Sequence, residues 1–84
     1  MHNPEYLAGA ALEEVVDRSD ELMATLRTGA VKAVRTHYEL LRGQIVALSR
    51  HEQTWLADKP QAVPPYRAVL TQAQALLDVT QEYL

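Results

Sequence analysis

The stretch VRTHYELLRGQIVALSRHEQTW, residues 34–55, decides the fold. Its apolar positions recur at alternating steps of four and three residues, with Glu52 as the interruption; the series runs Val34, Tyr38, Leu41, Ile45, Leu48, Glu52, Trp55. Side chains at this spacing lie along one face of an α-helix. The pattern predicts a helix from about residue 30 to 57.

The segment before it carries the same spacing. The series Ala8, Leu12, Val15, Ser19, Leu22 and Leu26 has the same steps, and Val16 and Met23 widen the apolar stripe. The segment opens with Asn3-Pro4-Glu5, in which Asn can accept a backbone N–H bond, Pro has a helical φ, and Glu favours the positive end of the helix dipole. A helix is expected over residues 4–27.

The phase of the pattern slips at Thr28-Gly29, between these two segments. Glycine after a helical run commonly ends the helix, and Thr28 could cap a following one, so a tight turn at residues 27–30 is favoured. The alternative is one long helix that runs through a stutter at Gly29.

The second boundary is DKPQAVPP, residues 58–65. Its three prolines lack N–H donors and push the preceding residues out of the α region, so the middle helix must end there. A last helix is expected over residues 65–83, with Pro65 in its first turn and the 3–4 series Tyr66, Val69, Ala73, Leu76, Thr80 and Tyr83. Trp55 and Tyr66 flank the turn and are expected to pack across it.

Length and composition set the fold class. Eighty-four residues allow one domain, the absence of cysteine leaves packing alone to hold the core, and twelve alanines with no phenylalanine favour closely approaching helices. We expect an all-α fold, either an antiparallel three-helix bundle or a long helical hairpin with a shorter C-terminal helix. We also expect a homodimer or higher oligomer, in which two chains complete one another's core.

The charges are unevenly distributed along a chain of net charge −3. Residues 1–26 hold six acids against one base, and residues 27–50 hold five bases against one acid. These segments are expected to lie side by side with charges at their rims, or else to form an ordinary solvated surface. The net negative charge argues against a general nucleic-acid binder.

Four cations form a basic stripe on the middle helix. At 100° per residue, Lys32, Arg35, Arg42 and Arg50 project within about 80° of one another. Such a stripe could meet an acidic protein, nucleic acid or an anionic surface. Val46 and Glu39 share the stripe and no aromatic residues interleave it, which disfavours nucleic acid.

Candidate catalytic and metal-binding motifs fail on spacing. The segment HEQTW begins at His51 like a helical zinc motif, but Trp55 stands where the second histidine is needed. His37 and His51 would lie about 21 Å apart along one helix. The adjacent acids Glu13 and Glu14 diverge by 100°, whereas catalytic carboxylates need burial or a close partner, so a solvated face is expected for them. We therefore expect no enzyme activity, metal or cofactor.

The sequence also carries no anchoring signal. No run of 18 apolar residues is present, and the start Met-His-Asn-Pro-Glu lacks the features of a signal peptide. His2 stands where myristoylation needs glycine, and without cysteine there is no prenylation or palmitoylation. A cytoplasmic location is expected.

The layout of a long amphipathic helix, the stop LADKPQ at residues 56–61 and a shorter helix that ends in Tyr resembles the coarse plan of phasins. Phasins coat polyester granules. The layout is also similar to that of small secretion-needle subunits, two helices joined by a proline turn. The resemblance implies self-assembly or surface coating, and it assigns no functional residue.

The pattern as a whole predicts a non-enzymatic helical protein–protein interaction module, such as an adaptor, small chaperone or inhibitor, that acts through an amphipathic helix face. The alternative is a phasin-like or filament-type surface-coat protein. The residues expected to form the interaction face are Leu12, Val15, Leu22, Leu26, Arg35, Tyr38, Leu41, Arg42, Ile45, Leu48, Trp55 and Tyr66.

Overall fold

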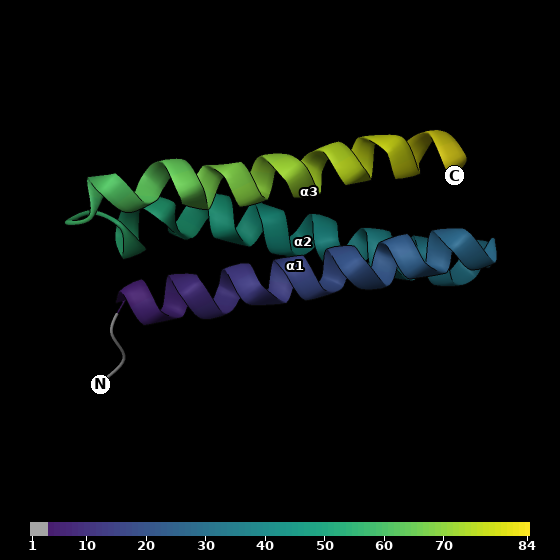
Figure 1. Cartoon of the computed structure of the whole chain (residues 1–84), viewed down its shortest axis with the longest axis horizontal. Helices are drawn as coiled ribbons and strands as arrows, with labels where there is room; N and C mark the ends of the chain where they lie inside the picture. Colours follow the sequence, from purple (N-terminus) through teal and green to yellow (C-terminus); the bar gives the residue numbers. More distant parts are fainter. Residues whose placement is uncertain (1–3) are drawn as a thin grey trace.

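A computed structural model describes residues 4–84 of the chain. It contains three α-helices, α1 (Pro4–Thr28), α2 (Val31–Trp55) and α3 (Val63–Tyr83), and a short 3₁₀ turn η1 (Pro60–Ala62) before α3. Successive helices run antiparallel, and each packs against the other two (Figure 1). The prediction of an all-α three-helix bundle is confirmed, and no strand occurs within residues 4–84.

The chain turns at Gly29 between α1 and α2. The φ angle of Gly29 is 71°, in the left-handed region that favours glycine, and its N–H donates to the Leu26 carbonyl at 3.3 Å. The turn is confirmed, and the alternative of one continuous helix is wrong. Thr28 is not the cap residue of α2, because Ala30 holds that position and no side chain caps the helix. The Thr28 hydroxyl donates to the Thr25 carbonyl at 2.7 Å and accepts from the Ala30 N–H at 3.4 Å.

The other helix boundaries lie within two residues of those expected. α2 ends at Trp55, and α3 begins at Val63 instead of Pro65. Pro64 and Pro65 fit inside the first turn because the first N–H groups of a helix have no intrahelical partner to lose. α1 is described from Pro4, as expected; the capping role predicted for Asn3 and the position of His2 lie outside the described residues.

The core is formed by the faces that the three helices turn toward one another. Its buried apolar residues are Ala8, Val15, Leu22, Val34, Leu41, Ile45, Leu48, Leu56, Tyr66, Leu70, Ala73 and Leu77. Thr80 is fully buried among them, and its hydroxyl donates to the Leu76 carbonyl at 2.7 Å, so no polar group is left unpaired there. The three helices thus complete one core within a single chain.

The bundle is flattened, with extents of 43 × 23 × 16 Å. In Figure 1, α2 lies behind α1 and α3, and α1 packs more extensively against α2 than against α3. The face turned away from α2 is therefore the less tightly closed one, and α1 and α3 form its two sides.

Candidate functional site

The residues expected to form an interaction face lie mostly inside the bundle. Six of them are buried in the core: Val15, Leu22, Leu41, Ile45, Leu48 and Tyr66. Four are half-buried and pack against it: Leu12, Leu26, Tyr38 and Trp55. Only Arg35 and Arg42 are exposed. The apolar stripe is therefore used to fold the chain, and a partner can reach only its edges.

The ring contact found for Trp55, which was expected to pack against Tyr66 across the turn, is with His51. The Trp55 ring stacks on His51, one turn earlier in α2, with ring centroids 4.5 Å apart and planes 11° from parallel. Tyr66 is buried, and its hydroxyl donates to the Leu48 carbonyl at 2.6 Å. Burial, with a smaller contribution from the nearby Glu52 charge, raises the pKa of Tyr66 to about 12. At this end of the bundle Tyr66 is thus part of the core, and Trp55 packs against the core.

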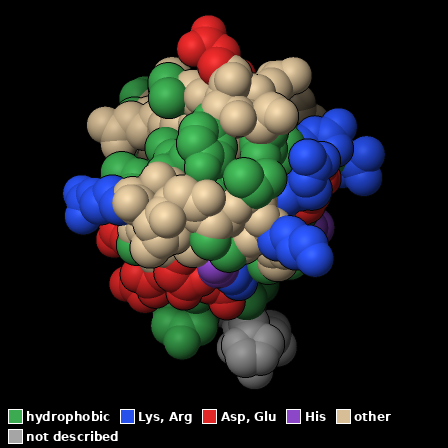
Figure 2. Space-filling model, turned by 90° about the vertical axis from the view of Figure 1, so that its right-hand side faces the viewer, with side chains coloured by type: hydrophobic (Ala, Val, Ile, Leu, Met, Phe, Trp, Pro, Cys, Tyr) green, Lys and Arg blue, Asp and Glu red, His purple; other side chains and the backbone are tan. Residues whose placement is uncertain are grey.

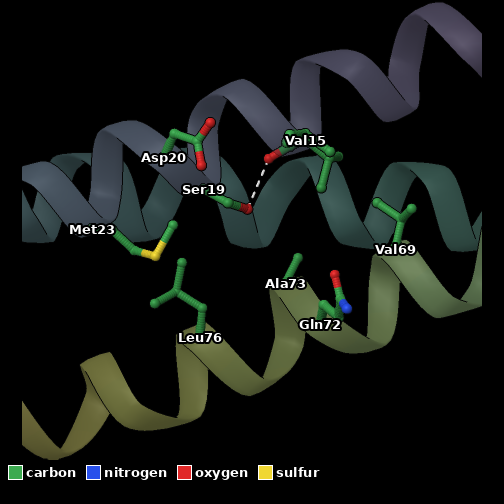
Figure 3. Close-up of a pocket in the computed structure, with 9 residues that line it drawn as sticks. Val15, Ser19, Asp20, Met23, Val69, Gln72, Ala73 and Leu76 are labelled. Atoms are coloured by element: carbon green, nitrogen blue, oxygen red, sulfur yellow. Dashed lines mark hydrogen bonds between the residues drawn. The ribbon is translucent and has the colours of Figure 1, made fainter.

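An apolar groove of about 250 Å³ runs between α1 and α3 (Figure 3). It is lined on α1 by Val15, Val16, Ser19, Asp20 and Met23, and on α3 by Val69, Gln72, Ala73 and Leu76. Val15 and Ala73 are buried, whereas Val16 is 46% and Met23 39% exposed. The hydroxyl of Ser19 donates to the Val15 carbonyl at 2.8 Å, so it is already paired within α1. The groove presents mainly aliphatic surface.

This groove continues along α1. Val16 also borders a second hollow of about 260 Å³ with Leu12, Glu13 and Asp17. The carboxylates of Glu13, Asp17 and Asp20 are exposed along this side of α1, and none of them forms an ion pair within residues 4–84. The result is an aliphatic groove with an unneutralised acidic row beside it, which we call the α1–α3 groove.

One feature of the sequence indicates this groove, although the groove was not predicted from it. Val16 and Met23 broaden the apolar stripe of α1 beyond the series Leu12, Val15, Ser19, Leu22. One helix–helix contact covers a narrow stripe, so extra apolar positions at its edge must either meet a third helix or remain exposed. In this bundle they remain exposed at the groove.

The basic stripe of α2 lies on the outer surface of the bundle. Lys32, Arg35, Arg42 and Arg50 are all exposed, and Val46, 44% exposed, lies among them. In Figure 2 most of the Lys and Arg side chains lie on the right, with another on the left, and the Asp and Glu side chains lie mainly at the lower left, with one group at the top. We call the outer surface of α2 around Val46 the basic face.

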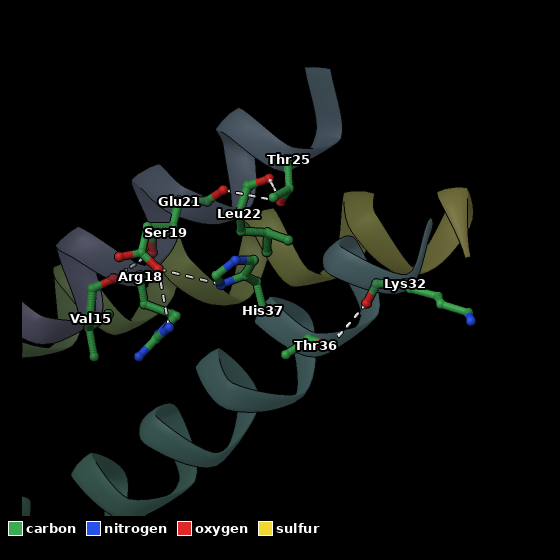
Figure 4. A network of polar contacts seen from close by, with 9 residues as sticks. All are labelled: Val15, Arg18, Ser19, Glu21, Leu22, Thr25, Lys32, Thr36 and His37. Carbon is green, nitrogen blue, oxygen red and sulfur yellow. Dashed lines mark hydrogen bonds and ion pairs between the residues drawn. The ribbon is translucent and has the colours of Figure 1, made fainter. Parts of the chain in front are cut away.

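A small polar network joins α1 to α2 (Figure 4). Arg18 Nη1 donates to Glu21 Oε2 at 3.1 Å, and the same oxygen lies 3.4 Å from Nδ1 of the half-buried His37. His37 therefore lies in the contact between α1 and α2. The acidic and basic segments do lie side by side, but the ion pairs of Arg18 and Arg42 are to acids of their own helices.

A second ion pair ties α2 to α3. Arg67 donates from Nε and Nη2 to the two carboxylate oxygens of Glu52, each at 2.8 Å. These hydrogen bonds hold the pKa of Glu52 below its usual range and raise that of Arg67. Glu52, the apparent interruption of the α2 stripe, therefore sits at the edge of the core as a paired charge.

The described residues bring together no group suited to metal binding. Within residues 4–84 no three His, Asp or Glu side chains lie close enough to hold a metal ion. The adjacent acids Glu13 and Glu14 are both exposed. None of the described helices is long and apolar enough to cross a membrane.

Comparison with protein-family models, with curated proteins and with solved structures finds no match to this chain. Two exposed surfaces of the bundle, the α1–α3 groove and the basic face, are therefore the candidate binding sites.

Proposed function

We propose that this chain is a cytoplasmic, non-enzymatic protein–protein interaction module, of the adaptor, small-chaperone or inhibitor kind, and that its working surface is the α1–α3 groove. The occupant that fits is an amphipathic helix whose aliphatic face is flanked by Lys or Arg. The observation that carries the proposal is the exposure of Val16 and Met23 at an aliphatic groove beside unpaired carboxylates.

The shape of the groove favours a helix. Two helices already form its sides, and a fourth helix laid between them could place its apolar ridge against Val16, Met23 and Leu76. Methionine suits such a contact because its flexible side chain adapts to different partners. Clustered exposed apolar side chains also mark interaction sites in small proteins.

The charge beside the groove indicates the kind of helix. Glu13, Asp17 and Asp20 have no ion-pair partner within residues 4–84. A partner with basic flanks would neutralise them and associate faster, whereas an acidic partner would be repelled. The proposal predicts a stoichiometric complex without turnover.

The test uses a synthetic helical peptide of about 20 residues, long enough to span about 30 Å of the groove. The peptide carries Leu at helical 3–4 spacing with Lys on both flanks, and a control peptide carries Glu in place of Lys. Fluorescence anisotropy should show binding of the lysine peptide and weak or no binding of the glutamate peptide.

Two variants assign this binding to the groove. Met23→Asp should lower the affinity for the lysine peptide by about tenfold or more, because it places a charge in the aliphatic contact. Glu82→Arg changes an exposed acid on α3 that lines none of the described hollows, and it should leave the affinity unchanged. Equal binding of both peptides, or no effect of Met23→Asp, would contradict the proposal.

The second candidate function is a self-assembling surface-coat protein of the phasin or filament type. It is favoured by the separation of charge between the exposed acids of α1 and the exposed cations of α2. It predicts oligomers that grow with concentration and binding to apolar surfaces. A chain that stays monomeric at high concentration and ignores lipid and polymer surfaces would count against it.

A further inference from the structure

The basic face carries cations that the chain itself does not neutralise. Lys32, Arg35 and Arg50 form no ion pair within residues 4–84, and Arg42 has only a long contact, 3.8 Å, with Glu39 of its own helix. Val46 is exposed among these cations. The basic face is thus a cationic helix surface with one exposed aliphatic side chain, Val46, among its cations and with Glu39 beside Arg42.

The charge of the basic face, and the exposed Val46 within it, fit the occupant that the α1–α3 groove favours. The groove is lined by aliphatic side chains and bordered by Glu13, Asp17 and Asp20, and it lies on the side of the bundle away from α2. One molecule therefore carries both a helix with basic flanks and an acidic groove, on surfaces too far around the bundle to meet each other. Only a second copy can bring them together.

We propose that copies of this chain associate head to tail, with the basic face of one copy seated in the α1–α3 groove of the next. The inference rests on the proposed function, because it fills the same groove. Val46 would meet Val16 and Met23, and Arg35 and Arg42 would lie near the carboxylates beside the groove. The aliphatic stems of arginine also cover apolar surface while their charged ends stay in water.

The charge pattern favours this arrangement over a symmetric dimer. A two-fold axis through the groove would place the row Glu13, Asp17 and Asp20 against its own copy, and like charges would repel. Head-to-tail contact instead pairs opposite charges. It also leaves a free groove at one end and a free basic face at the other, so the assembly is open-ended.

The first measurement is the average mass of the full chain by sedimentation equilibrium at rising protein concentration. In about 50 mM salt the mass should grow beyond that of a dimer, and in about 500 mM salt it should fall toward that of a monomer, because salt screens exposed charges. Asp20→Arg should abolish the association, and so should the double change Arg35→Ser/Arg42→Ser. The control Glu82→Arg makes the same change in net charge as Asp20→Arg and should associate like the unaltered chain.

Mixing the two deficient variants tests the direction of the contact. The Asp20→Arg chain keeps a working basic face, and the Arg35→Ser/Arg42→Ser chain keeps a working groove. Together they should form one intact contact, which gives a one-to-one dimer and nothing larger. Circular dichroism of each variant checks that these exposed substitutions leave the helices folded.

A monomeric unaltered chain in about 50 mM salt would overturn the inference, as would association that survives Asp20→Arg or a mixture that stays monomeric. Failure of the proposed function would be visible separately, as failure of the lysine peptide to bind. If the chain is monomeric but still binds the peptide, the groove remains the proposed partner site and only the self-association is contradicted.

Discussion

Two sides of α1, one in the core of the bundle and one at the exposed edge of the groove, are built from equally apolar residues but differ in burial. Val15 and Leu22 of α1 are fully buried, whereas Val16 and Met23, each one position further along the chain, are exposed. One residue corresponds to a rotation of about 100° around the helix, which is enough to pass from the core to the open side of a flattened three-helix bundle. Apolar content alone therefore does not separate a folding surface from a binding surface; coverage by a neighbouring helix does.

The two sides also differ in how their polar groups are paired. Near the core, Tyr66 is bonded to the Leu48 carbonyl and Glu52 to Arg67. Beside the groove, Asp17 and Asp20 have no ion-pair partner within the described chain. On the closed side these two groups are paired within the chain, although Arg18 Nε, His37 Nδ1 and Gln44 Oε1 are buried without a hydrogen-bond partner among the described residues. The open side leaves apolar area and charged groups available to a partner.

The largest effect is expected from truncation on the closed side. Leu41 is fully buried, so Leu41→Ala removes packing and leaves a cavity, and it should lower the free energy of unfolding by about 2–5 kcal/mol. Urea denaturation followed by circular dichroism measures the loss. A loss below about 1 kcal/mol would mean that this side is no better packed than the groove.

A smaller loss is expected from Tyr66→Phe, which keeps the ring and removes the bond to the Leu48 carbonyl. The cost should be about 0.5–1.5 kcal/mol at neutral pH. Because the pKa of Tyr66 is raised from 10.0 to about 12, the folded state binds this proton more tightly than the unfolded state. The stabilisation from Tyr66 is therefore complete below pH 10.0 and lost as the pH rises toward about 12.

The phenylalanine variant should lack this alkaline decline. Urea denaturation of both proteins over a pH series measures the difference between them, which should shrink as the pH passes 10.0. A difference that stays constant across this range would show that the hydroxyl is not held in its neutral form by burial.

The paired charge at the edge of the core should contribute less, because Arg67 is largely exposed. The lowered pKa of Glu52 means that its ion pair stabilises the fold above the ordinary value of 4.5 and that this contribution is lost as the pH falls below it. Glu52→Gln should therefore be slightly less stable than the unaltered chain at pH 7. This difference in stability should disappear in acid, and thermal unfolding of both proteins at several pH values measures it. A difference that grows in acid would contradict the lowered pKa of Glu52.

The smallest effect on stability is expected at the groove. Met23→Gln keeps a similar helix propensity and removes an apolar side chain that is 39% exposed, so the free energy of unfolding should change by no more than about 0.5 kcal/mol. The same substitution should measurably lower the affinity for the lysine peptide. If Met23→Gln destabilises the chain as much as Leu41→Ala does, the groove belongs to the core and the contrast between the two sides fails.

Much of the fold was predictable because the chain repeats one strong local signal. The 3–4 spacing predicted the three helices, and the prolines of residues 58–65 predicted the boundary between the second and third helices. Gly29 marked the favoured site of the first turn. The positions of aromatic rings were less predictable. Trp55 stacks on His51 and Tyr66 reaches Leu48 because a ring's neighbours depend on how two helices are rotated, which spacing within each helix does not define.

The candidate site was predicted poorly for a related reason. The residues predicted for the interaction face were mostly the apolar residues of the 3–4 series, such as Leu22 and Leu41. A small domain must bury these residues to fold. Only Arg35 and Arg42 of that set reach the surface fully. The groove residues Val16 and Met23 appeared merely as broadening of the stripe.

By itself, the order of residues determined that this chain is helical, where it turns and which charges each helix carries, because capping, proline geometry and side-chain periodicity act within a few residues of each other. The tertiary structure alone decided which apolar edge stays open and which charges find partners. Those outcomes depend on the rotation and separation of three packed helices, and residues far apart in the sequence, such as Met23 and Leu76, become neighbours only after the helices have packed.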